Sequence, residues 1–143
     1  MSNAILVVED EVLLSKSIQR YLGKAGHDVR LAISGRVAID ILAKDRKFDA
    51  ILMDVEMPEM NGFEATKHIR ENMNSHIPIM ALTADVTTAD LKKCKAVGMN
   101  DYISKPIDEK LLYGKIIDLI KKPKHLKDTV LNESGSKCTD LTY

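Results

Sequence analysis

Short apolar runs alternate with longer segments of helical period along most of this chain. Few folds accommodate such an alternation, because it is typical of repeated strand-helix units. Five apolar runs can be counted, and we expect strands at residues 4–8, 28–31, 49–53, 78–82 and 101–103. Three of them are nearly all apolar, which indicates a parallel sheet covered by helices on both faces.

Apolar residues recur at helical spacing in the segments between the expected strands, as they do on the buried side of a helix. The repeats are Leu14, Ile18 and Leu22; Val37 and Ile41; Ala65 and Ile69; and Leu112, Ile116 and Ile120. Residues suited to helix ends agree with this placement. They are Ser34, Thr87 with Asp90 as a capping box, and Asp108 at helix starts, and Gly26 and Gly98 at helix ends.

These patterns predict one doubly wound α/β domain of (βα)₅ form that spans residues 1–122. Residues 123–143 contain Pro123 and a Glu-Ser-Gly-Ser stretch, and their composition is that of a polar linker or tail. We expect this tail to be disordered or to lead to a downstream domain.

A doubly wound fold binds its ligand outside the carboxyl ends of the strands, so the residues that follow each strand indicate the chemistry. Glu9 and Asp10 follow the first expected strand and Asp54 follows the third. Three carboxylates at one edge of a sheet would repel one another, which implies a cation. Oxygen ligands suit Mg²⁺, and the lack of His or Cys at these strand ends disfavours zinc.

Two further strand ends supply a cation and a hydroxyl, from Lys105 and Thr83. Both side chains can hold phosphate oxygens, so the set predicts a phosphoryl site with Asp54 as the nucleophile on the central strand. Each residue also has a simpler interpretation, as a helix start, turn former or surface lysine. We favour the site because four independent strand ends supply the residue types that it needs.

Charge and composition exclude several other functions. The 21 basic residues balance 21 acidic ones, and the chain has no Trp and two Phe, so we expect no direct nucleic-acid binding. The apolar runs are much shorter than the roughly 20 residues of a membrane helix, so we expect no membrane contact by this segment. Two cysteines far apart in the sequence predict free thiols and a cytoplasmic location.

Four segments resemble the signature segments of response regulator receiver domains of two-component systems. They are VVEDE at residues 7–11, LMDVEMPEMNG at 52–62, ALTA at 81–84 and YISKP at 102–106. The resemblance covers about residues 4 to 121 and implies a flavodoxin-like sheet with strand order 2-1-3-4-5.

The resemblance also implies a role for each matched residue. Asp54 would be phosphorylated by a partner's phosphohistidine, and Lys105 would pair with the phosphoryl group. Glu9, Asp10 and Asp54 would bind Mg²⁺ together with the backbone carbonyl of Glu56.

Thr83 and Tyr102 would form the switch pair of the family, in which the Thr hydroxyl moves to the phosphoryl oxygen and the aromatic ring turns inward behind it. Lys105-Pro106 would be a cis peptide. Gly62 is expected at a tight turn before the third helix.

Residues 57–66 and 81–84 look more like the receivers of hybrid sensor kinases than those of DNA-binding regulators. Residues 138–143 resemble the opening of a histidine phosphotransfer domain. The resulting hypothesis is an excised receiver that relays phosphate from a sensor histidine kinase, or from its own kinase module, to a histidine phosphotransfer domain. The chain would then be the cytoplasmic part of a membrane-bound hybrid kinase; the alternative is a free-standing regulator with a disordered terminus.

Two alternatives stay open at this point. One is a Mg²⁺-dependent phosphatase that turns over through an aspartyl-phosphate. The other is a non-phosphorylated receiver-like binding module. Whether the receiver counts as an enzyme is also open, because its chemistry would be self-phosphorylation and self-dephosphorylation on Asp54.

Overall fold

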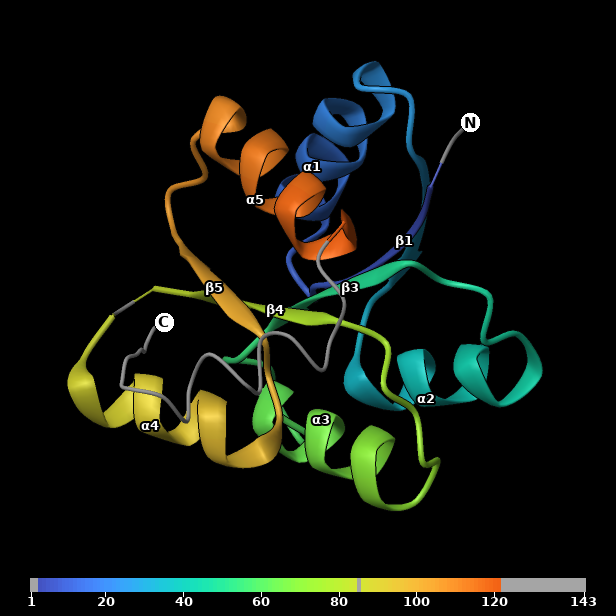
Figure 1. Cartoon of the computed structure of the whole chain (residues 1–143), viewed down its shortest axis with the longest axis vertical. Helices are drawn as coiled ribbons and strands as arrows, with labels where there is room; N and C mark the ends of the chain where they lie inside the picture. The colour runs from blue at the N-terminus through green and yellow to red at the C-terminus, as the bar shows by residue number, and fades with distance from the viewer. Residues whose placement is uncertain (1–2, 85, 122–143) are drawn as a thin grey trace.

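The computed structural model describes residues 3–84 and 86–121, and the predicted tail at 123–143 lies outside the described residues. Strands and helices alternate strictly along the described part (Figure 1). The strands are β1 (Ala4–Val8), β2 (Asp28–Ala32), β3 (Ala50–Asp54), β4 (Ile79–Thr83) and β5 (Asp101–Ser104). The helices are α1 (Val12–Lys24), α2 (Gly35–Lys44), α3 (Gly62–Glu71), α4 (Thr88–Val97) and α5 (Glu109–Lys121).

The strands form one parallel sheet in the order β2-β1-β3-β4-β5, between two layers of helices. Figure 1 shows α1 and α5 on one face and α2, α3 and α4 on the other. Each layer encloses its own apolar core, and alternate residues of one strand enter opposite cores: Leu52 of β3 packs on the α1 and α5 side and Met53 on the other. The predicted fold class is therefore confirmed.

Four strands end one residue later than expected, β2 at Ala32 and the other three at polar residues: Asp54, Thr83 and Ser104. The backbone ladder continues through these polar residues: Val55 N–H donates to Leu82 O at 3.0 Å and Lys105 N–H donates to Thr83 O at 2.8 Å. A polar side chain at a strand end does not stop backbone pairing, so the apolar run places the end of these strands one residue too early; β3 and β4 also begin one residue later than expected.

Most predicted helix ends are confirmed. Ser34 caps α2 by accepting from Val37 N–H at 3.1 Å, and Asp108 accepts from Leu111 N–H at 3.1 Å before α5. Gly26 and Gly98 both have left-handed backbones, with φ of 91° and 101°.

Two details of the helix ends differ from the prediction. At the start of α4, Thr87 accepts from Asp90 N–H at 3.0 Å, but among the described residues no return bond completes the box. The complete capping box starts α3 instead, where Asn61 and Glu64 exchange two bonds of 2.9 Å.

The buried side of α2 also differs from the prediction. Val37 and Ile41 are half-buried, and Gly35, Ala38 and Leu42 are buried instead. A side chain at Gly35 would lie 3.1 Å from Met60 Sδ, so small residues bring this helix close to its neighbours. The close approach of α2 to its neighbours, and not the larger side chains of Val37 and Ile41, decides which side of the helix is buried.

Arg70 of α3 ties two loops together at the end of the sheet where β4 and β5 begin. Its Nε and Nη2 donate to Gly98 O at 3.0 and 2.8 Å, and its Nη1 donates to Ser75 O and Ile77 O at 3.0 and 2.8 Å. Nη2 also donates to Asn100 Oδ1 at 3.0 Å. One guanidinium therefore holds the C-terminal end of α4 and the start of β4 in place.

No helix in the described ranges, 3–84 and 86–121, is both long and apolar enough to cross a membrane.

Candidate functional site

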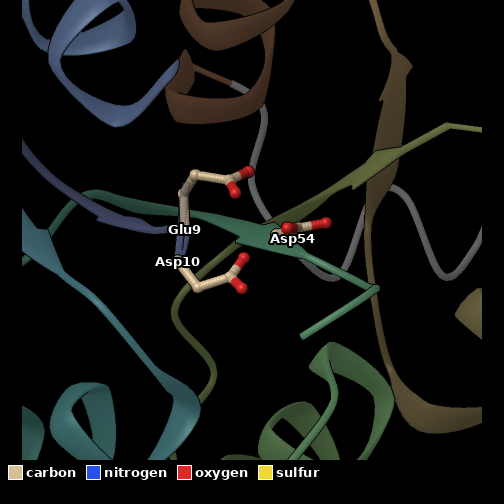
Figure 2. A group of neighbouring side chains, drawn as sticks. All are labelled: Glu9, Asp10 and Asp54. Atoms are coloured by element: carbon tan, nitrogen blue, oxygen red, sulfur yellow. The ribbon is translucent and has the colours of Figure 1, made fainter. Parts of the chain in front are cut away.

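Three carboxylates come together at the carboxyl edge of the sheet. Glu9 and Asp10 directly follow β1, and Asp54 is the last residue of the neighbouring strand β3. One carboxylate oxygen from each lies within 4.8 Å of the others, and Figure 2 shows the Glu9 and Asp10 side chains directed to the side on which Asp54 lies. Glu9 and Asp54 are each 1% exposed, whereas Asp10 is exposed. The acidic edge expected from the strand ends is thus present.

Lys105 lies beside two of these acids. It follows β5, and its Nζ lies 3.4 Å from Asp54 Oδ1, 3.5 Å from Asp54 Oδ2 and 3.6 Å from Glu9 Oε1. Partial burial works against the charged ammonium, but attraction to Asp54 and Glu9 outweighs it and raises the pKa of Lys105. A permanent positive charge therefore faces the Asp54 carboxylate. The Lys105-Pro106 peptide is cis, as predicted.

Glu9 is the acid most perturbed by its surroundings. Burial raises the pKa of its carboxyl from 4.5 to about 7, and the charge of Asp54 adds to the effect, while the Glu11 N–H and Lys105 oppose it. Glu9 Oε2 accepts from Glu11 N–H at 2.9 Å. Within the described ranges Glu9 Oε1 accepts no hydrogen bond, and the Lys105 ammonium lies 3.6 Å from it.

The donor set fits a hard divalent cation. All three groups are carboxylates, and a buried carboxylate oxygen without a hydrogen-bond donor is an atom that a cation would satisfy. Mg²⁺ takes oxygen ligands from one or two carboxylates and keeps several waters, and the exposure of Asp10 leaves room for them.

The position of Asp54 depends on Gly62, the first residue of α3. A Cβ at Gly62 would lie 2.3 Å from Asp54 O and 2.8 Å from Val55 Cα. Gly62 follows the loop before α3, where a turn was expected, but its backbone is not left-handed, so conformational freedom is not the reason for glycine. Glycine is required because α3 begins directly against the backbone of β3 and of the residue that follows it.

The loop after Asp54 also orients its carboxylate. Glu56 N–H donates to Asp54 Oδ1 at 3.1 Å, so the backbone of Glu56 lies beside the cluster while its side chain is exposed. Its carbonyl as a metal ligand stays a prediction.

Thr83 and Tyr102 lie on the same face of the sheet. Thr83 ends β4 and is buried, and Tyr102 pairs with Ala81, two residues before Thr83 on that strand. The Tyr102 ring is half-buried and packs against the core under α2, α3 and α4. Their role as a switch pair stays a prediction.

One contact of this site was missed in the sequence. Lys115 of α5 places its Nζ 4.9 Å from the centroid of the Tyr102 ring. The two residues lie in the same strand-helix unit but on different elements, and their spacing carries no signal of the contact.

Comparison with known proteins identifies the family. A family model of the response regulator receiver domain matches residues 5–117. The chain belongs to the response regulator receiver domain family. Receivers of this family generally bind Mg²⁺ at an acidic site, and the carboxylate cluster is the corresponding feature of this receiver.

Sequence relatives of this receiver include histidine kinases of much greater length. It is 41% identical over 116 residues to hybrid signal transduction histidine kinase I of Dictyostelium discoideum, covering 76% of this chain and 7% of that protein. It is 37% identical over 135 residues to probable histidine kinase 6 of Oryza sativa subsp. japonica, covering 81% of this chain and 14% of that one. The receiver thus spans a small part of these relatives and is homologous to the receiver domains of hybrid histidine kinases.

Solved structures agree with the assignment. The receiver domain of sensor histidine kinase PA1611 from Pseudomonas aeruginosa, with a magnesium ion in its active site cleft, is 35% identical with a TM-score of 0.76, covering 85% of this chain and all of that one. Chemotaxis protein CheY4 of Vibrio cholerae is 31% identical with a TM-score of 0.79, covering 83% of this chain and 99% of that one.

Proposed function

We propose that this receiver accepts a phosphoryl group on Asp54 from a phosphohistidine and passes it on in a phosphorelay. The observation that carries the proposal is the constellation at the carboxyl edge of the sheet. A buried aspartate at the end of the central strand faces a lysine ammonium at 3.4 Å and two further carboxylates within metal-ligand reach. This combination of nucleophile, cation and metal ligands is what phosphoryl transfer to a carboxylate requires.

In the transfer step, an Asp54 carboxylate oxygen forms a bond to phosphorus. The bond between phosphorus and the donor imidazole nitrogen breaks, and the imidazole nitrogen keeps that electron pair and takes a proton from solvent water. Lys105 pairs with a phosphoryl oxygen, for which its ammonium is already positioned beside Asp54. The Thr83 hydroxyl donates to another phosphoryl oxygen.

Glu9, Asp10 and Asp54 would hold Mg²⁺ together with the Glu56 carbonyl. When bound, the ion would neutralise the charge that three carboxylates and a phosphoryl group bring together. The carboxylates by themselves repel one another and the incoming phosphoryl group, so we expect little transfer without the ion.

The proposed partners are a histidine kinase and a histidine phosphotransfer domain. Support comes from the relatives, which include a hybrid histidine kinase with which this receiver shares 41% identity. Receivers of such kinases act with a kinase or phosphotransfer histidine in general. A cytoplasmic location, in which such partners would meet it, is part of the proposal.

The test is intact mass after incubation with acetyl phosphate and Mg²⁺. We expect the wild-type protein to gain one phosphoryl group and Asp54→Asn to gain none. Asp40→Asn, at an exposed position of α2, is the matched control and should label like the wild type. Undiminished labelling of Asp54→Asn would remove the proposed acceptor.

A second measurement separates a relay from a phosphatase. The phosphorylated receiver is mixed with a histidine phosphotransfer protein, and the phosphoryl group is followed by mass on both chains. Transfer to the histidine protein is expected. Sustained hydrolysis of p-nitrophenyl phosphate through many turnovers per chain would instead identify a phosphatase.

A further inference from the structure

Three residues form a contact set at the outer edge of the sheet. Lys115 Nζ lies 4.9 Å from the centroid of the Tyr102 ring and 3.3 Å from Asp101 Oδ1. The same Asp101 oxygen accepts from Tyr102 N–H at 2.8 Å. The Lys115 and Asp101 side chains are only 25% and 23% exposed, so the ion pair is half-buried. We call this set the edge latch.

The edge latch connects opposite faces of the sheet. Tyr102 packs with the core under α2, α3 and α4, whereas α5 lies on the other face (Figure 1). Because β5 is the outermost strand of the sheet order, Lys115 can reach past it to the ring. Asp101 holds the ammonium at that edge, since it binds both Lys115 and the backbone of Tyr102.

We infer that Lys115 is a positioning residue for Tyr102, which holds the ring at the sheet edge and so opposes its movement toward Thr83. The inference rests on the proposed function, because it takes Tyr102 as the residue that responds to phosphorylation at Asp54. A ring that moves inward along the face shared with Thr83 leaves the ammonium, which Asp101 retains at the edge. The cation–π contact is then lost, and the inward state is populated less than it would be without Lys115.

The size of the effect follows from the geometry of the contact. Among the described residues the distance of 4.9 Å is shorter than the other cation–π distances, which are 5.2 Å for Lys93 on Phe63 and 5.8 Å for Arg20 on Tyr21. Loss of such a contact at a partly exposed site shifts an equilibrium by about twofold to fivefold. When the charge at residue 115 is removed, the Tyr102 ring should therefore respond at a lower concentration of a phosphoryl mimic.

The experiment titrates beryllofluoride, at saturating Mg²⁺, into protein labelled with ¹³C in its tyrosine rings. The Tyr102 signal is assigned by its loss in Tyr102→Phe, and its movement gives the midpoint. Lys115→Gln removes the charge and keeps a polar side chain, whereas Lys115→Arg keeps the charge. Lys110→Gln changes an exposed lysine of the same helix and serves as the matched control.

We expect the Lys115→Gln midpoint to fall about twofold to fivefold below the wild type, with Lys115→Arg and Lys110→Gln near the wild type. The thermal midpoint of each variant is measured in parallel, because a purely structural role would lower it without moving the beryllofluoride midpoint. Asp101→Asn keeps an acceptor for Tyr102 N–H and removes the ion pair, and we expect it to shift the midpoint in the same direction as Lys115→Gln.

If the wild-type Tyr102 signal moves but the beryllofluoride midpoint of Lys115→Gln is unchanged or higher, the edge latch alone is overturned. A wild type whose Tyr102 signal does not move at any beryllofluoride concentration overturns the proposed switch at Tyr102 and the edge latch with it. The two failures are therefore distinct.

Discussion

Replacement of Gly62 by alanine tests the packing that holds Asp54, the proposed acceptor, in place. The added Cβ would lie 2.3 Å from Asp54 O, 2.8 Å from Val55 Cα and 3.0 Å from Asp54 C. All three atoms belong to the backbone of β3 or the residue after it, so no flexible side chain can move aside. Relief requires a shift of about 1 Å between the start of α3 and the acceptor strand.

The expected cost follows from this overlap. Overpacking of this kind lowers the free energy of unfolding by about 1–3 kcal/mol. For a domain of this size the thermal midpoint should fall by about 4 °C per kcal/mol. Because the shift acts on the Asp54 backbone, phosphorylation by acetyl phosphate should also slow, and a displacement of about 1 Å can reduce such a rate a hundredfold.

Gly114→Ala is the matched control on α5. A Cβ there meets no atom within 4 Å, and the position is exposed within a helix. Alanine should therefore raise the free energy of unfolding by about 0.5–1 kcal/mol, because glycine is the poorer helix former.

Urea unfolding followed by circular dichroism measures the free energy, and intact mass over time measures phosphorylation. The reasoning would be refuted by a Gly62→Ala protein as stable as the wild type and labelled at the same rate. A destabilised variant that still labels at the wild-type rate would show that α3 moves and the acceptor does not.

Four further outcomes are expected. Asp10→Ala should abolish Mg²⁺ binding in a titration and Glu9→Ala should weaken it less; equal affinities would mean that the acid pair is only a solvated helix start. The pKa of the Glu9 carboxyl is raised from 4.5 to about 7, so between these pH values the folded protein holds a proton that the unfolded chain has released. Without Mg²⁺ the urea midpoint should therefore fall as pH rises from about 4.5 to about 7. Glu9→Gln should flatten this slope, and parallel curves for the two proteins would contradict the assignment. Thr83→Ala should fold and accept phosphate but lose the beryllofluoride-dependent shift of Tyr102, and a wild-type shift would refute the coupling. Arg70→Met should lower the free energy of unfolding by about 2–4 kcal/mol, since several carbonyls lose their donor; a change below about 0.5 kcal/mol would show that water replaces the guanidinium.

The fold and the positions of the acidic residues follow from local features of the sequence. Apolar runs such as residues 5–8 and 50–53 are buried on both faces, so their composition alone predicts strands of a covered parallel sheet. Parallel strands bring their carboxyl ends to one edge, and the sequence therefore predicted that Glu9, Asp10 and Asp54 would meet before any distance was known.

Strand boundaries and helix faces were predicted less accurately, because they depend on contacts with neighbouring elements. Asp54 and Thr83 lie inside the ladder because their backbone groups pair with neighbouring strands, which side-chain polarity does not report. The buried side of α2 contains Ala38 because the close approach at Gly35 decides which side of the helix faces inward.

Only the tertiary structure decided the contacts between different elements. Three examples are the need for glycine at residue 62, the hydrogen bonds of Arg70 to two loops and the position of Lys115 over Tyr102. Each joins segments that periodicity treats separately. Hydrophobic periodicity reports which side of an element is buried, because burial repeats with the backbone geometry. It does not report which atom of another element lies opposite, because that depends on how the finished layers pack.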